Sequence, residues 1–94
     1  MKVNWGPRAK RDLRELIAYI AEDSIQGAGS VAARILKAAE LLGRMPQGGR
    51  LGRVAGSRER VVGRTPYLLA YRVRSGQVRI LRVYHGARRW PASL

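Results

Sequence analysis

Apolar residues recur along this chain with two different periods. From residue 7 to about 22, and again after Ser24, they return every three or four positions, which predicts two amphipathic helices. The two apolar stripes are Ala9, Leu13, Leu16, Ile17 and Ile20, then Val31, Ile35, Ala38 and Leu42. The short apolar or alternating runs typical of β-strands lie at residues 2–5, 58–63, 67–73 and 78–84. The chain is therefore predicted to combine helices with strands.

Residues that start and stop helices lie at the ends of both periodic segments. Pro7 suits the first turn of the first helix, where its missing N–H has no partner to lose. Ser24 is a good N-cap for the second helix, although the glycines that follow leave Ser30 as an alternative start. Gly43 fits a C-terminal cap, and Pro46 cannot continue the helix. These signals predict two helices joined by a tight turn.

One irregular segment and two short turns separate the predicted strands. Residues 46–57 hold four glycines and a proline, so we expect a loop there. Residues 64–66 and the Ser75-Gly76 pair are short enough for hairpin turns. The predicted order is β-α-α-β-β-β in a single domain over residues 1–94. The expected fold class is α+β, with a helical hairpin packed on one face of a small antiparallel sheet.

The charge of the chain narrows the choice of partners. It carries 19 lysines and arginines against 6 acidic residues, a formal net charge of +13 over 94 residues. Such an excess favours polyanionic partners, which are nucleic acid, an anionic membrane or an acidic protein. Arginine greatly outnumbers lysine, and its fork binds phosphate and carboxylate through two parallel hydrogen bonds. A GC-rich genome would raise the arginine content as well.

Composition also argues against several kinds of site and location. The absence of cysteine rules out a disulfide framework and a thiolate metal site, and a single histidine argues against zinc. We therefore expect neither a metal nor a cofactor. The N-terminal residues lack the apolar core of a signal peptide, and no apolar run approaches the length of a membrane span. These features predict a cytoplasmic protein without a membrane partner.

A single histidine among cations is the strongest candidate for chemistry. His85 ends the last predicted strand, and an imidazole can move a proton at neutral pH. Cleavage of RNA through its 2′-hydroxyl also needs cations to stabilise charge on phosphate, which Arg82, Arg88 and Arg89 would supply. The structural interpretation, which we favour, is that His85 closes the strand and hydrogen-bonds locally.

Glu59 is the other candidate for proton transfer, because it is the only carboxylate after Glu40. Its neighbours Arg58 and Arg60 are expected to hold it ionised in salt bridges, which would make it a poor general base. In the predicted strand, Arg58 and Arg60 share one face with Val62, while Glu59 lies on the other.

A further set of residues suits a surface that contacts an acidic partner or a target. These residues are Arg53, Arg58, Arg60, Arg72, Arg82, Arg88, Arg89 and Trp90. Trp90 would stack on a base or, in the interpretation that we favour, anchor its segment against the sheet or a helix. The residues that alternate onto one face of the strand at 67–73 indicate core or a partner surface, and they are Tyr67, Leu69, Tyr71 and Val73.

Six stretches, in a fixed order, span nearly the whole chain. They are W-G-P-R-A-K-R-D-L at 5–13, I-A-Y-I-A-E-D-S at 17–24, P-Q-G-G-R-L-G-R at 46–53, S-R-E-R-V-V at 57–62, T-P-Y-L-L-A-Y-R-V at 65–73 and I-L-R-V-Y-H-G-A-R-R-W-P at 80–91. In this ordered set the chain resembles the ParE/RelE family of toxins from bacterial type II toxin–antitoxin systems. The resemblance implies the β-α-α-β-β-β layout derived above.

The resemblance implies one of two activities. RelE-like toxins cut messenger RNA in the ribosome, whereas ParE-like toxins poison DNA gyrase and are not nucleases. Leu68 departs from the RNA-cleaving relatives, which typically carry a catalytic arginine at this position. A leucine cannot neutralise phosphate, and Arg72 on the same face would serve only if the site moved by more than about 10 Å. Arg50 and Arg53 also stand where some RNA-cleaving members have a lysine pair.

The resemblance therefore favours a ParE-like toxin directed at DNA gyrase, and two alternatives stay open. One is a ribosome-dependent mRNA endonuclease with His85, Glu59 and Arg60 as catalytic residues. The other is a relative that binds its partner without being toxic. In each case the expected partner is a cognate antitoxin of the ribbon-helix-helix, ParD-like kind, which binds the toxin and silences it.

Overall fold

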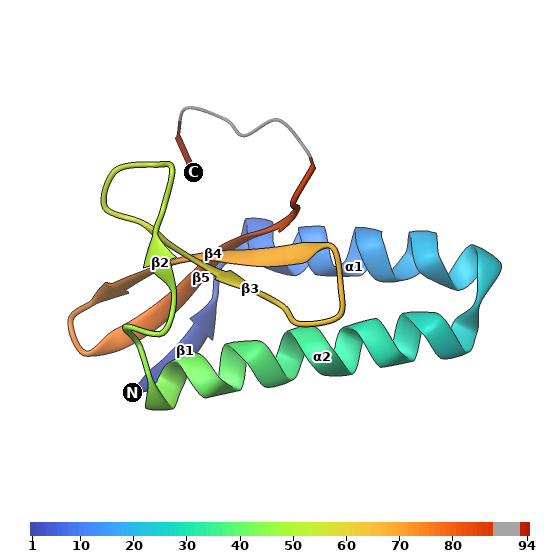
Figure 1. Ribbon diagram of the computed structural model, residues 1–94, viewed down its shortest axis with the longest axis horizontal. Helices are drawn as coiled ribbons and strands as arrows, with labels where there is room; N and C mark the ends of the chain where they lie inside the picture. The colour runs from blue at the N-terminus through green and yellow to red at the C-terminus, as the bar shows by residue number, and fades with distance from the viewer. Residues whose placement is uncertain (88–92) are drawn as a thin grey trace.

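A computed structural model describes residues 1–87 and 93–94 of the chain (Figure 1). Its elements are β1 (Lys2–Trp5), α1 (Pro7–Asp23), α2 (Ile25–Arg44), β2 (Arg50–Leu51), β3 (Arg58–Val61), β4 (Tyr67–Arg74) and β5 (Gln77–His85). The two helices lie side by side and pack on one face of the sheet (Figure 1). The predicted α+β fold, with a helical hairpin on a sheet, is confirmed.

The sheet is mixed, whereas the sequence predicted an antiparallel one. Its strands lie in the order β1-β5-β4-β3-β2. β1 runs parallel to β5, with Lys2 opposite Gln77 and Trp5 opposite Ile80, while the other neighbouring strands are antiparallel. Side-chain alternation determines which face a residue occupies but carries no information about strand direction. The pattern at residues 2–5 therefore could not reveal a parallel partner.

A short additional strand forms within the segment that was predicted to be a loop. Arg50 and Leu51 make up β2 and pair with Glu59 and Arg58 of β3. Both residues of β2 are exposed, and Leu51 is 79% accessible. A strand of two exposed residues has no alternation that a sequence pattern can show.

Ser24 separates the two helices and caps the second one. Its side-chain oxygen accepts a hydrogen bond from the Gly27 N–H at 2.8 Å. This bond satisfies one of the free donors of the first turn. The helix therefore begins at Ile25, and the alternative start at Ser30 is wrong.

Gly43 has a different role from the expected C-terminal cap. The helix α2 continues through it to Arg44, and the amino terminus of Met1 donates a hydrogen bond to the Gly43 carbonyl at 2.6 Å. A Cβ at this position would lie 2.7 Å from the Met1 carbonyl oxygen and 3.1 Å from the side chain of Val3. A glycine is therefore needed here for β1 to approach α2.

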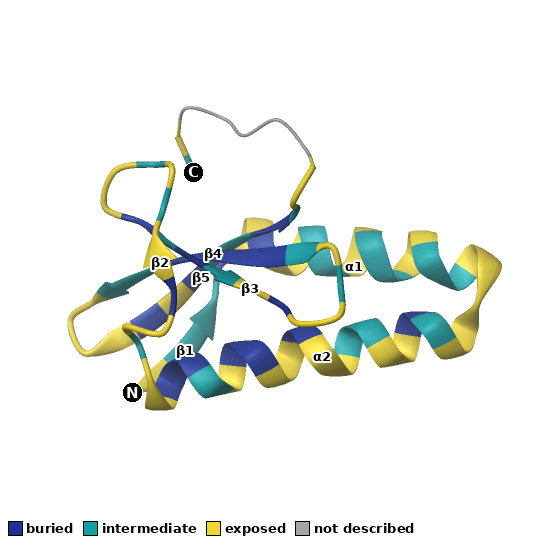
Figure 2. Ribbon diagram, in the orientation of Figure 1, coloured by how far each residue is buried: buried dark blue, intermediate teal, exposed yellow. Residues whose placement is uncertain are grey.

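The main core lies between the helices and the sheet (Figure 2). Its buried members are Ala9, Ile35, Ala38, Ala39, Leu42, Val62, Leu69, Tyr71, Val78, Ile80 and Val83. The predicted stripe of the second helix supplies Ile35, Ala38 and Leu42, as expected. The stripe of α1 is less deeply buried, since Leu13 and Leu16 pack against the margin of the core.

A smaller apolar cluster occupies the opposite, outer face of the sheet. Leu68, Ala70 and Tyr84 are each at most 5% exposed, and Leu94 packs against them. The alternation predicted for β4 is confirmed, because its other apolar side chains face the helices, and these are Tyr67, Leu69, Tyr71 and Val73.

The predicted turn between β4 and β5 is present. Ser75 and Gly76 have positive φ angles of 53° and 72°, as in the two-residue turns whose twist suits a hairpin. Further along the ladder, Ala70 is opposite Arg82 but Tyr71 is opposite Ile80. This shift in register is a β-bulge, which increases the local twist of the strand pair.

Candidate partner-binding site

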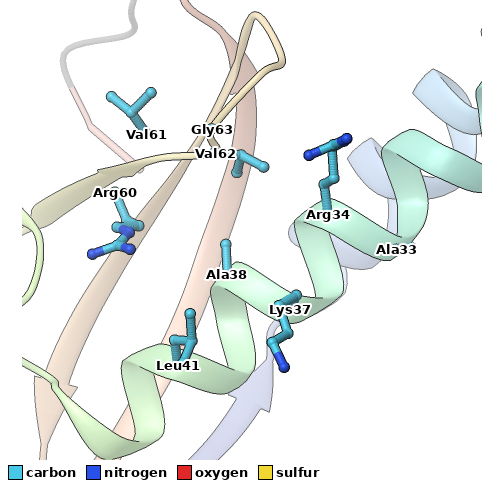
Figure 3. Close-up of a pocket in the computed structure, with 9 residues that line it drawn as sticks. All are labelled: Ala33, Arg34, Lys37, Ala38, Leu41, Arg60, Val61, Val62 and Gly63. Atoms are coloured by element: carbon cyan, nitrogen blue, oxygen red, sulfur yellow. The ribbon is translucent and has the colours of Figure 1, made fainter.

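A groove between α2 and β3 is bordered by positively charged side chains (Figure 3). Its volume is about 480 Å³. The residues that line it are Ala33, Arg34, Lys37, Ala38 and Leu41 of α2, followed by Arg60, Val61, Val62 and Gly63. Aliphatic side chains and glycine therefore form most of its surface, and three cations border it.

The three cations of the groove are Arg34, Lys37 and Arg60. Among the described residues, none of them has a carboxylate within salt-bridge distance. Arg60 Nη1 lies 3.4 Å from the Gly48 carbonyl oxygen, at the long end of a hydrogen bond. Arg34 and Lys37 were not singled out in the sequence, although their spacing of three residues places them on one side of a helix.

Glu59 pairs with arginines of the segment before β3 rather than with its neighbours Arg58 and Arg60. Its side chain is 1% exposed, with Arg50 Nη2 at 3.1 Å and Arg53 Nε at 3.7 Å from its carboxylate oxygens. The Arg53 backbone N–H donates to the same carboxylate at 2.8 Å. The carboxylate is ion-paired, as expected. Because both partners belong to residues 46–57, these contacts hold that segment against Glu59.

Arg58 and Arg60 lie on the face of β3 that points toward the helices, as the alternation predicted. Arg58 donates to the Gly49 carbonyl at 2.8 Å. The Tyr71 hydroxyl donates to the Pro46 carbonyl at 2.9 Å and accepts from the Gly49 N–H at 2.8 Å. These hydrogen bonds hold the chain between α2 and β2 in place. Of the two arginines of β3, Arg60 borders the groove.

Arg82, which was predicted to contact a partner, forms an internal ion pair. Its Nε and Nη2 donate to the Asp12 carboxylate of α1 at 2.8 and 3.2 Å, and its guanidinium lies 4.8 Å from the centre of the Tyr84 ring. The hydrogen bond with Asp12 raises the pKa of Arg82 above its ordinary value. Asp12 also accepts a hydrogen bond from the Val83 N–H at 2.9 Å. The pairing of β1 with β5 ends at Ile80, so Asp12 takes the place of a strand partner at Val83.

His85 lines a cavity together with two carboxylates, and of the arginines expected beside it only Arg82 lies in the described part of the chain. Its ring meets Tyr67 edge-on at a centroid distance of 5.6 Å, and its Nδ1 accepts the Ala87 N–H at 3.2 Å. Asp12 and Glu15 line the adjacent cavity of about 570 Å³. Arg82 neutralises Asp12, and the described residues that line this cavity include no arginine or lysine, so the cavity offers a phosphate group no cation.

The two candidates for proton transfer do not come together. Glu59 is opposite Ala70, on the outer face of the sheet, whereas His85 is opposite Tyr67, on the face that bears the helices. The strand β4 also separates them within the sheet. Leu68, at the position of the arginine in RNA-cleaving relatives, is 3% exposed and belongs to the outer apolar cluster.

The remaining predicted contact residues are dispersed. Arg72 lies directly opposite Arg79 in the ladder of β4 and β5, and donates to the Ala55 carbonyl at 3.5 Å. Arg79 was not singled out in the sequence, because its position opposite Arg72 depends on the register between β4 and β5. Three predicted residues lie outside the described part of the chain, and they are Arg88, Arg89 and Trp90.

The side chains of residues 1–87 and 93–94 form no group of three or more histidine, cysteine, aspartate or glutamate residues that could hold a metal ion. Within the same residues, neither helix has the length and apolar character needed to cross a membrane.

The architecture matches chains in two solved toxin–antitoxin structures. The match to a chain of the chromosomal ParDE system from P. aeruginosa has a TM-score of 0.82 and 24% identity, and covers 90% of this chain and 95% of that one. The match to a chain of the RelBE2 toxin–antitoxin complex from Mycobacterium tuberculosis has a TM-score of 0.65 and 28% identity, and covers 89% and 95%. The class is therefore the RelE/ParE-like α+β fold.

The chain belongs to the family of ParE toxins of the type II toxin–antitoxin system parDE, whose family model matches residues 3–90. It is 41% identical over 93 residues to "Putative toxin Y4kP" of Sinorhizobium fredii, covering 99% of this chain and 96% of that protein. It is 40% identical over 87 residues to "Toxin RelE2" of Caulobacter vibrioides, covering 93% and 97%. The resemblance seen in the sequence is confirmed.

Proposed function

We propose that this toxin acts on DNA gyrase without cleaving nucleic acid, and that a co-encoded, ParD-like ribbon-helix-helix antitoxin neutralises it in the cytoplasm. Membership of the ParE family supports gyrase as the target. The proposal that the toxin is not a nuclease depends on one observation. His85 and Glu59, which an RNA-cleaving site would have to bring together, lie far apart in the sheet.

Cleavage of RNA needs a proton-transfer group and a cation at the same phosphate. His85 lies beside Asp12 and Glu15, with no arginine among the described residues that line its cavity. Glu59 is sealed beneath the 46–57 segment, on the other face of the sheet. Leu68 provides an apolar side chain where a cation would be required. This arrangement supports binding rather than catalysis.

The surface charge supports the proposed antitoxin. The three cations that border the groove of α2 and β3 have no internal carboxylate among the described residues, so an acidic partner would meet them at little cost. Two solved structures that share this fold, the ParDE system and the RelBE2 complex, are of toxin–antitoxin systems.

A His85→Ala variant separates the two activities of the fold. We expect it to inhibit the supercoiling activity of purified gyrase as strongly as the wild type, because the contacts of His85 within the described residues, with Tyr67 and Ala87, are structural. Growth arrest on induction should likewise persist, and the antitoxin should relieve it. A wild-type toxin that leaves gyrase fully active would contradict the proposed target.

The name of one relative, "Toxin RelE2", favours the second candidate function, which is ribosome-dependent mRNA cleavage. In that case the wild type should cut mRNA in a translation assay, and His85→Ala should slow the cut by about 10²–10⁴-fold, the usual contribution of a general acid or base. A protein that affects neither gyrase nor translation would be a binding-only relative.

A further inference from the structure

We propose that two arginines that face each other across β4 and β5, Arg72 and Arg79, bind the phosphate backbone of duplex DNA. This inference rests on the proposed action on gyrase, an enzyme whose substrate is duplex DNA. It adds a direct contact between the toxin and that DNA, on the outer face of the sheet and away from the groove of α2 and β3.

Strand alternation places both arginines on the outer face. The residues on either side of them belong to the core under the helices, and they are Tyr71, Val73, Val78 and Ile80. Because successive side chains of a strand point to opposite faces, Arg72 and Arg79 point away from the helices. They are direct partners in the ladder, where opposite Cβ atoms lie about 4.5–5.5 Å apart.

No acidic side chain of the described residues compensates this arginine pair. Neither arginine has a carboxylate within salt-bridge distance there. Asp12 and Glu59 are engaged in the ion pairs described above, and the other acids of the chain belong to the helices, which cover the opposite face of the sheet. Like charges directly opposite each other destabilise a strand pair. A bound anion would relieve this repulsion.

The two guanidinium groups are turned to opposite sides. Arg72 Nη2 donates to the Ala55 carbonyl at 3.5 Å, on the side of β3. Arg79 lies on the side of β1, since a Cβ at Gly6 would be 3.6 Å from its Nη2. The hydrogen bond of Arg72 is at the long limit, so this side chain can leave it at little cost. Both guanidinium groups can therefore turn toward an anion placed between them.

A second row of cations extends the site toward the turn of the hairpin, which lies at the opposite end of the molecule from the turn between the helices (Figure 1). Arg74 and Lys2 are both paired with Gln77, from β4 and β1 respectively, and both are exposed. The row is two residues from the first, about 7 Å at roughly 3.4 Å per residue. Phosphates recur about every 3.4 Å of axis along each DNA strand. The arginine patch, defined as Lys2, Arg72, Arg74 and Arg79, therefore suits a phosphate backbone.

The surroundings of the arginine patch favour a duplex over a single strand or an acidic protein. Single strands are bound by aromatic side chains that stack on bases, and protein interfaces are centred on buried apolar anchors. Next to the patch, the outward-facing Asn4 and Gln77 are polar. Tyr84, the aromatic residue of the outer apolar cluster, is only 5% exposed. Contacts with the backbone alone suit a duplex, whose bases are stacked inside.

Fluorescence anisotropy with a short labelled duplex of mixed sequence tests the site. Arg72→Gln with Arg79→Gln is compared with Arg11→Gln with Arg14→Gln, which removes the same charge from the exposed face of α1. We expect the patch variant to bind roughly 10-fold more weakly than the control. The slope of log affinity against log salt should fall by about 2 in the patch variant, one for each lost phosphate contact. Equal affinities and slopes of the two variants would overturn the site.

Thermal melts and competitors complete this comparison. The patch variant should melt at or above the temperature of the wild type, because it loses a like-charge pair. Should it fail to fold, Arg72→Gln and Arg79→Gln alone decide the question, each lowering the slope by about 1. Single-stranded RNA or polyglutamate that displaces the labelled duplex more effectively than unlabelled duplex would overturn duplex DNA as the ligand.

Binding of the toxin to purified gyrase separates this inference from the proposed function. The wild type should bind gyrase with duplex DNA roughly 10-fold more tightly than gyrase alone, since the second contact is then intramolecular. The patch variant should bind both forms as the wild type binds gyrase alone. Equal affinity of the wild type for both forms would overturn the inference and leave the proposed target intact. A toxin that binds neither form would contradict the proposed function, and this inference with it.

Discussion

At the scale of single residues, this toxin uses two of its six acidic residues to hold parts of the fold together. Asp12 holds Arg82 and the edge of β5, and Glu59 holds Arg50 and Arg53 from a buried position. Each of these pairs cancels one positive charge internally. The charge that a partner meets is therefore dominated by arginine and lysine.

Replacing Glu59 tests this internal use of charge. Glu59→Gln keeps the size of the side chain but loses the ion pairs and leaves a buried group poorly matched, so it should cost about 1–3 kcal/mol of folding free energy. The control is Glu40→Gln, whose i,i+4 pair with Arg44 is exposed at 61% and 75% and should change stability by no more than about 0.5 kcal/mol. Denaturant unfolding of both variants gives the comparison, and equal losses would contradict it.

Tyr84 makes stability depend on alkaline pH. Burial raises its pKa above the ordinary value of 10.0. The unfolded chain therefore loses the phenol proton at a lower pH than the folded protein does. The contribution of neutral Tyr84 is complete below pH of about 10 and is lost as the pH rises through the folded-state pKa.

We expect Tyr84→Phe to flatten the alkaline fall in stability. Melting temperatures from about pH 8 to 11 should decline less steeply in the variant than in the wild type, since phenylalanine has no proton to lose. Tyrosinate absorbance of the wild type should include a phenol that titrates above the ordinary value of 10.0 and that is missing from the variant. Identical slopes for the two proteins would contradict the assignment.

At the scale of elements, the boundary between the helices rests on one hydrogen bond of Ser24. Ser24→Ala removes the acceptor of the Gly27 N–H and should cost about 1 kcal/mol. Ser30→Ala is the control, because Ser30 is exposed within the same helix and alanine is the better helix former. Thermal unfolding followed by circular dichroism should show a lower midpoint for the first variant only.

The sequence predicts an element well where the apolar residues recur with a clear period. It predicts poorly those features that depend on which strands pair and in which register. Ile35 and Leu42 mark the second helix by spacing alone, and the hairpin at Ser75 follows from its turn chemistry. The partners of Glu59 were not visible, because Arg50 lies in a two-residue strand whose register places it beside Glu59, and Arg53 lies in the irregular segment that follows this strand. The groove was missed for the same reason, since Lys37 and Arg60 belong to elements far apart in the chain.

At the scale of the whole molecule, the net charge of +13 should govern how fast the toxin meets its antitoxin. Opposite charges steer two proteins together, and salt screens the attraction over about 8 Å at physiological ionic strength and 3 Å at 1 M. We expect the association rate constant to fall steeply between these conditions, while the dissociation rate changes little. Stopped-flow mixing measures both, and an association rate independent of salt would contradict the expectation.

The parallel pairing of β1 with β5 also has a consequence for the timing of synthesis. Lys2 is made long before its partner Gln77. The ribosome adds only about 5–20 residues per second, and β1 has no parallel partner to join until β5 emerges. β1 therefore remains unpaired throughout that interval. A partner already waiting in the cell has that interval to meet the toxin as its fold is completed.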